Sequence, residues 1–196
     1  MEKNSRQEQV LVWRFLFIAT LGAWVLVAVA GLYLILRPQV LSFQATEEAV
    51  SSEKSVSADE GLHPKSISIS SLGIDLPISS ATILTDGTWE VSEDGVSHLQ
   101  HSRLPGMGGN VVVYGHNTTT LLGSLASITD GAVITITTEN GQQFSYQVEN
   151  TQTVSPETIS VVAPTETEVL TLYTCAGWFD SQRFVVQAKP VFADAQ

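Results

Sequence analysis

Hydrophobic and polar residues alternate in several short stretches of the chain, which is the pattern of half-buried β-strands. The alternation begins at 67–69 and resumes at 74–78, with a glycine-containing turn between the two stretches. It returns at 132–138 and 143–149, which flank an Asn-Gly pair at 140–141 that favours a tight hairpin turn. These stretches predict pairs of short strands.

The remaining stretches extend the same all-β pattern. Residues 110–114 form an apolar run typical of a buried strand, and 168–175 and 183–188 predict a final hairpin joined by turn residues. About eight strands at short spacing, with almost no long helix, predict a closed or sandwiched all-β domain over residues 65–196. The other expectations are a weak strand at 88–91, a short helix or loop at 95–102, and short helices at 121–128 and 155–161.

A long uncharged segment precedes this domain. Residues 15–36 carry no charge over 22 positions, enough at about 1.5 Å per residue to cross a hydrocarbon core of about 30 Å. We therefore predict a transmembrane signal anchor there. Basic residues in the segment 1–14 favour a cytoplasmic N-terminus and an extracellular remainder. A cleaved signal peptide, suggested by Ala-Val-Ala at 28–30, is the alternative, and it would also export the domain.

Composition separates the anchor from the folded domain and limits the partners. Residues 37–64 are rich in Ser, Glu and Ala with few large apolar residues, so they predict a flexible extracellular tether. The net charge is -11, and after Arg37 only five Lys and Arg face 18 Asp and Glu. This balance argues against nucleic-acid binding, which needs clustered basic residues.

Three residues carry the candidate chemistry. Cys175 is the only cysteine, so in an exported domain it forms no internal disulfide and is buried, cross-linked between chains or reactive. The predicted hairpin brings Arg183 beside it. His116 follows Gly115 at the end of a buried strand, where scaffolds present catalytic groups. The alternatives are a structural thiol, a strand-end arginine and a surface histidine. We assign that last role to the other histidines, His63, His98 and His101.

The chain resembles the sortase family, membrane-anchored cysteine transpeptidases of bacterial surfaces. The resemblance covers about residues 65–190 and rests on motifs in the family's order. These are Ile-x-Ile-x-x-Leu-Gly-Ile-Asp-Leu-Pro-Ile at 67–78, Gly115-His116, Thr-Leu-x-Thr-Cys at 171–175, and Arg183. It implies a closed eight-stranded sortase-type β-barrel with short helices, behind one N-terminal transmembrane helix, with the three candidate residues converging on one groove.

The resemblance also implies a mechanism. Cys175 would attack the scissile carbonyl, His116 would protonate the leaving amine, and Arg183 would stabilise the oxyanion. The donor would be a surface protein with a C-terminal Leu-Pro-x-Thr-Gly-like sorting signal, cut through a thioacyl intermediate, with Thr174 lining the peptide groove. The acceptor would be a primary amine from a cell wall precursor or a pilin lysine.

The loop aromatics, the acidic residues and the function each allow more than one interpretation. Trp178 and Phe179 could form a lid or pack against the barrel, and we expect packing because exposed aromatic side chains are costly. The acids Asp94, Glu166 and Glu168 permit calcium without indicating it, and we expect no required metal or cofactor. The alternative functions are a non-catalytic tethered barrel that binds peptides or wall material, and a thiol peptidase that only hydrolyses.

Overall fold

The computed structural model describes residues 24, 26–28, 61–85 and 87–191. Trp24 and residues 26–28 are helical and lie inside the predicted span 15–36. The rest of that span, the N-terminal segment 1–14 and residues 37–60 of the predicted tether lie outside the described residues. Within the described part of the chain, no helix has both the length and the apolar character needed to span a bilayer.

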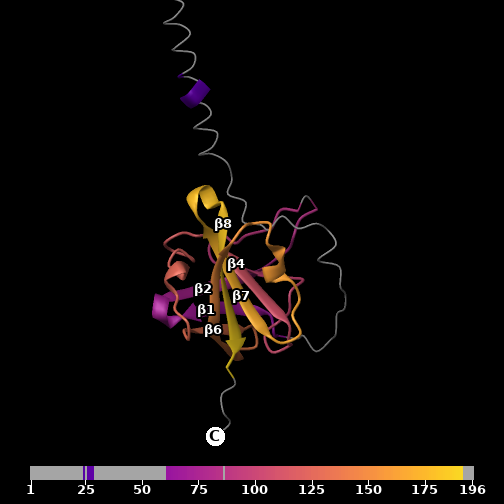
Figure 1. The fold of residues 1–196 in the computed structure, drawn as a ribbon. Helices are drawn as coiled ribbons and strands as arrows, with labels where there is room; N and C mark the ends of the chain where they lie inside the picture. The colour runs from indigo at the N-terminus through magenta and orange to yellow at the C-terminus, as the bar shows by residue number, and fades with distance from the viewer. Residues whose placement is uncertain (1–23, 25, 29–60, 86, 192–196) are drawn as a thin grey trace, which may run out of the picture. The chain divides into compact units, whose positions relative to one another are not determined.

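The described part of residues 61–191 forms a closed β-barrel, which confirms the predicted all-β fold (Figure 1). The strands follow one another around the barrel in the order β1-β2-β3-β4-β7-β8-β6-β5. Most neighbours are antiparallel, but β2 with β3 and β4 with β7 are parallel. The bounds are β1 Pro64–Ile69, β2 Ile74–Ala81, β3 Val96–Leu99, β4 Asn110–Gly115, β5 Val133–Thr138, β6 Gln143–Val154, β7 Val169–Ala176 and β8 Gln182–Pro190.

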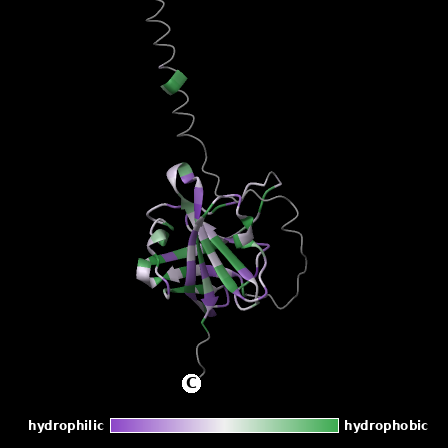
Figure 2. Ribbon diagram, in the orientation of Figure 1, coloured by the Kyte–Doolittle hydropathy of each residue, from purple (hydrophilic) through white to green (hydrophobic). Residues whose placement is uncertain are grey.

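Successive residues of the strands supply two separate apolar clusters, because neighbouring side chains in a strand point to opposite faces. Figure 2 shows hydrophobic and hydrophilic residues interleaved along the strands. One cluster draws on all eight strands and fills the barrel, with Ile67, Ile136 and Leu172 among its fully buried members. The second cluster, with Tyr114 and Tyr173, lies on the outer face of β4, β7 and β8. Residues 83–91 and 154–162 cover it.

Two elements differ from the sequence prediction. The predicted helix or loop at 95–102 contains strand β3, and the predicted strand at 88–91 makes only an isolated bridge between Ile83 and Trp89. All four residues of β3 are buried, so the strand lacks the polar alternation that would have marked it. His98 on β3 is therefore buried, with Nε2 3.0 Å from the Arg103 carbonyl oxygen, and its prediction as a surface histidine was wrong.

Four of the connections between the described strands contain short 3₁₀ helices. They are η2 (Ser70–Leu72), η3 (Leu125–Ser127), η4 (Ile159–Val162) and η5 (Trp178–Asp180). Of these, η3 and η4 overlap the two short helices predicted from the sequence. At the domain's start, the amide of Asn140 donates to the Gly61 carbonyl at 3.0 Å, so the chain is bonded to the barrel a few residues before β1.

Candidate active site

Cys175 and Arg183 occupy directly opposite positions on the antiparallel strands β7 and β8. Opposite residues on paired strands point to the same face of a sheet, so the thiol and the guanidinium share the outer face of the barrel. Each residue is only 3% exposed. The sequence prediction that the final hairpin sets these two side chains together is confirmed.

His116 lies at the same end of the barrel, on the other side of Cys175. β4 runs parallel to β7, and its last residue, Gly115, pairs with Thr174. His116 is therefore one position beyond that pair, level with Cys175, and strands this close lie about 4.8 Å apart. The three predicted residues thus come from the neighbouring strands β4, β7 and β8 at one level. His116 Nε2 is buried and has no hydrogen-bond partner among the described residues.

The glycine before His116 is required by close packing. A Cβ atom on Gly115 would lie 3.0 Å from Val96 Cγ1 and 3.2 Å from Leu122 Cδ1, inside ordinary contact distance. On the far side of His116, its carbonyl accepts a hydrogen bond from the Leu122 amide at 3.1 Å. The backbone of His116 is thus held on both sides, which fixes where its ring leaves the strand.

Thr174 lies on the opposite face of β7 from Cys175, because successive residues of a strand alternate. It is buried, and its hydroxyl donates to the Gly115 carbonyl at 2.8 Å. This contact ties β7 to β4 immediately before His116. The role in lining a peptide groove, which the family resemblance implied for Thr174, stays a prediction.

Burial and charge act on the Cys175 thiol in opposite directions. Burial is the largest effect and disfavours the thiolate, while the Arg183 guanidinium favours it and the Asp180 carboxylate opposes it. Together they raise the pKa of Cys175 from 9.0 to about 11. Arg183 itself is held at the loop, where Nη1 donates to the carbonyl oxygens of Asp180 at 2.8 Å and Gln182 at 3.0 Å.

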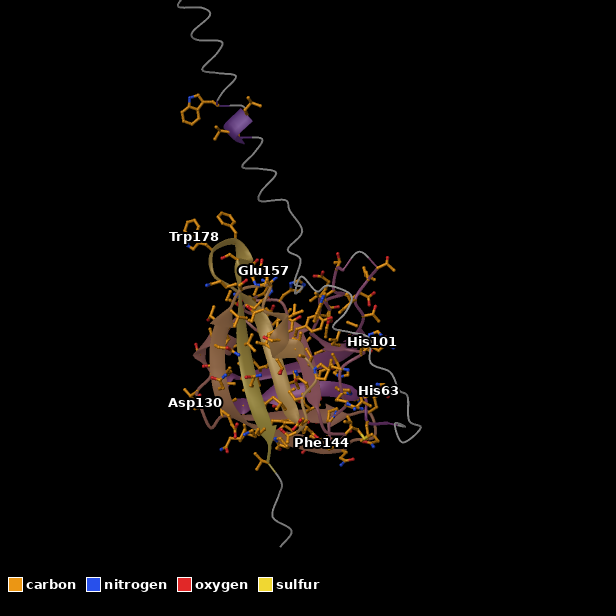
Figure 3. The ribbon with its side chains drawn as sticks, turned by 45° about the vertical axis from the view of Figure 1, so that its right-hand side comes forward. His63, His101, Asp130, Phe144, Glu157 and Trp178 are labelled. Carbon is orange, nitrogen blue, oxygen red and sulfur yellow. The ribbon has the colours of Figure 1, made fainter. Side chains whose placement is uncertain are left out.

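The loop between Cys175 and Arg183 carries two exposed aromatic side chains. Trp178 and Phe179 are 83% and 78% exposed, and their rings lie 5.6 Å apart in an edge-to-face arrangement. Figure 3 shows Trp178 pointing away from the barrel at the end of the β7–β8 connection. The expectation that these two residues pack against the barrel was therefore wrong. The alternative interpretation, that they form a lid, stays a prediction.

The Sortase domain family matches residues 67–191, which is more than half of the chain. The chain belongs to the sortase family. Solved structures agree with this assignment. A lid mutant of sortase A from Corynebacterium diphtheriae is similar at 32% identity and a TM-score of 0.58, covering 70% of this chain and 74% of that one.

Two class C enzymes are also similar to this sortase. Sortase C-1 from Actinomyces oris shares 26% identity with a TM-score of 0.54, covering 70% of this chain and 77% of that one. Sortase C1 from Streptococcus agalactiae, in complex with MTSET, shares the fold at 23% identity and a TM-score of 0.57, covering 68% and 72%. A comparison with curated proteins found no match.

Sequence reasoning missed the aromatic group beside the site in this sortase. Tyr114 and Tyr173 are register partners on β4 and β7, each two residues before a candidate catalytic residue. Their rings stack 5.3 Å apart, and the Trp89 ring packs edge-on against both. The Tyr114 hydroxyl donates to the Glu90 carbonyl at 2.7 Å. Only the strand register and the fold of the preceding loop bring these rings together, so periodicity could not have found them.

Glu168, one of the acids considered for calcium, forms hydrogen bonds within the folded domain of this sortase. Its carboxylate accepts hydrogen bonds from the amides of Gly106 and Gly108, each at 3.0 Å, and from the Tyr146 hydroxyl at 2.7 Å. These contacts tie the loop before β4 to the start of β7. Across residues 61–85 and 87–191, no group of three or more His, Cys, Asp and Glu is arranged to hold a metal ion.

Proposed function

We propose that this sortase is a cysteine transpeptidase that cuts a C-terminal Leu-Pro-x-Thr-Gly-like sorting signal and joins the product to a primary amine. The observation that carries the proposal is the alignment of His116, Cys175 and Arg183 on three adjacent strands at one end of the barrel. These are a proton carrier, a nucleophile and a fixed cation, which acyl transfer requires together.

The first half of the reaction forms a thioacyl enzyme. The Cys175 thiol gives its proton to the His116 imidazole, and its sulfur attacks the carbonyl carbon of the scissile peptide bond. The carbonyl oxygen becomes an oxyanion beside the Arg183 guanidinium. The C–N bond then breaks as the His116 imidazolium gives its proton to the leaving nitrogen. The acyl group remains on sulfur, and the amine fragment departs with the proton.

The second half transfers the acyl group to the acceptor. The neutral His116 imidazole takes a proton from the incoming amine, whose nitrogen attacks the thioester carbonyl. The C–S bond breaks as the amide forms, and its electron pair returns to the sulfur of Cys175. Attack by water instead of the amine would give hydrolysis, which is the second candidate outcome.

The raised pKa of Cys175 supports a thiol that is held back until substrate arrives. With a pKa of about 11, only about one thiol in 10⁴ is ionised at neutral pH. Burial is the main cause, so a bound peptide changes the environment that sets this value. Activation therefore depends on Arg183 and on proton transfer to His116 in the complex.

The partners and the location follow from the same proposal. We propose a single-pass anchor at 15–36 with the N-terminus inside, so that the barrel lies outside the cell. The donors are surface proteins carrying the sorting signal, and the acceptor is an amine of a cell wall precursor or a pilin lysine. The proposal includes no nucleic acid, no cofactor and no required metal.

The experiment incubates the full-length chain with a panel of Leu-Pro-x-Thr-Gly-like peptides and an amine acceptor, and follows the products by mass. Cys175→Ala is the inactive variant, and Ser127→Ala, an exposed position in η3, is the control for substitution as such. A ligated product that is absent in the Cys175 variant is the expected result.

Other outcomes favour the alternatives. Cleavage without ligation, for every acceptor tried, would favour a thiol peptidase. If no peptide is cut and Cys175 also resists alkylation at high pH, a non-catalytic peptide- or wall-binding barrel would become the better account.

A further inference from the structure

Asp180 combines three unusual features at the edge of the site. It lies in the β7–β8 connection with a φ of 55°, a left-handed conformation that non-glycine residues seldom adopt. Its carbonyl oxygen accepts a hydrogen bond from Arg183 Nη1 at 2.8 Å. Its carboxylate oxygen Oδ2 is buried and has no hydrogen-bond partner among the described residues. Strain of this kind tends to occur where a loop presents a side chain for function.

The carboxylate is close enough to the nucleophile to act on it electrostatically. The negative charge of Asp180 opposes ionisation of Cys175 and contributes to the raised pKa of the thiol. An acid here thus works against formation of the attacking thiolate in the first half-reaction.

We propose that Asp180 binds the ammonium group of the amine acceptor. The proposal rests on the proposed function and adds a residue that selects the acceptor. A buried carboxylate oxygen without a partner is costly, and a primary ammonium supplies both the opposite charge and the hydrogen bond.

The chemistry of the second half-reaction needs such a group. A primary alkylamine carries a proton at neutral pH, and in this form it has no lone pair for attack. Asp180 holds the ammonium beside the thioester, and one N–H proton passes to the neutral imidazole of His116, whose Nε2 also has no hydrogen-bond partner among the described residues. The freed lone pair forms the C–N bond, the C–S bond breaks, and the second proton of the new amide nitrogen goes to the sulfur of Cys175.

The test compares Asp180→Asn with the wild-type full-length chain. Asparagine keeps the shape of the side chain and also tolerates a left-handed φ, so the loop conformation is preserved while the charge is lost. The acceptors are a primary alkylamine, which is cationic, and hydroxylamine, which is uncharged at neutral pH. Asp130→Asn is the matched control, because Asp130 is exposed and lies toward the other end of the barrel from Trp178 (Figure 3).

We expect Asp180→Asn to raise the KM for the alkylamine about 10- to 100-fold, as for loss of a hydrogen bond to a charged group. Reaction with hydroxylamine should change less than about threefold, and Asp180→Glu should recover part of the alkylamine reaction. Asp130→Asn should leave both reactions as in the wild type.

Three results distinguish failure of the proposed function from failure of the role proposed for Asp180. If the wild-type chain ligates no amine, the proposed function itself fails. If the wild type ligates but Asp180→Asn uses the alkylamine equally well, the role of Asp180 is wrong. An equal loss with both acceptors would mean that Asp180 only supports the loop or Arg183, which also overturns the proposal.

Discussion

Cys175 and Arg183 are direct partners across the β7–β8 pair, and the guanidinium partly offsets the effect of burial on the thiol. Charge alone therefore does not activate this cysteine. The sequence placed a cation beside the thiol, and in the folded barrel desolvation outweighs the effect of that cation on the thiol pKa.

The pH dependence of Cys175 alkylation tests this balance. Because the pKa is raised to about 11, the neutral thiol predominates below that pH and the thiolate becomes the main form above it. Alkylation by iodoacetamide should thus rise about tenfold per pH unit from neutral pH upward, and level off only near pH 11. In the chain unfolded by urea, the alkylation rate should level off near pH 9. Arg183→Gln should move the folded plateau upward, and a plateau below 9 would contradict the raised pKa.

Replacing Arg183 should affect catalysis strongly. Arg183→Ala removes the proposed oxyanion donor and should lower kcat/KM by about 10² to 10³. Arg183→Lys should recover only part of this loss, because an ammonium lacks the planar donor geometry. Steady-state peptide cleavage measures both variants, with Lys189→Ala on the exposed part of β8 as the control. Full activity of Arg183→Lys would exclude a role for the planar group.

Thr174 should act through the position of His116. Thr174→Val removes the hydroxyl that donates to the Gly115 carbonyl and should lower the free energy of unfolding by about 1–2 kcal/mol. Thr174→Ser keeps the donor and should retain more activity. Denaturant unfolding and kcat/KM measure the two effects, with Thr135→Val on β5 as the control. If the loss were instead confined to the KM for the peptide, Thr174 would line the groove as the sequence suggested.

Stability measurements should distinguish the exposed Trp178 from the buried Trp89. Trp178→Ala should change the free energy of unfolding by less than about 0.5 kcal/mol, because the side chain is exposed. Trp89→Ala, at 3% exposure and packed on two tyrosine rings, should cost about 3–5 kcal/mol. Thermal or urea unfolding compares the two. Equal losses would show that Trp178 does pack in solution. A changed peptide cleavage rate in stable Trp178→Ala would support a lid.

Local patterns in the sequence were sufficient for much of the barrel. Alternation marked β1 and β2, and the Asn-Gly pair marked the hairpin of β5 and β6, because these strands each have one polar and one apolar face. They were insufficient for β3, which is buried on both faces and pairs in parallel with the preceding strand β2. A strand of that kind carries no local signal of its partner.

The sequence by itself determined the order of the site's parts. A histidine follows a glycine at a strand end, a lone cysteine comes later in the chain, and an arginine follows the cysteine after eight residues. Only the tertiary structure decided that His116 lies level with Cys175, since this depends on the parallel register of β4 and β7. In that register Thr174 bonds to Gly115, 59 positions earlier in the sequence. The fold likewise decided how far the thiol is buried, which sets its pKa, and it decided that Trp178 is exposed. Such properties arise from residues brought together over long separations, and a local pattern does not record them.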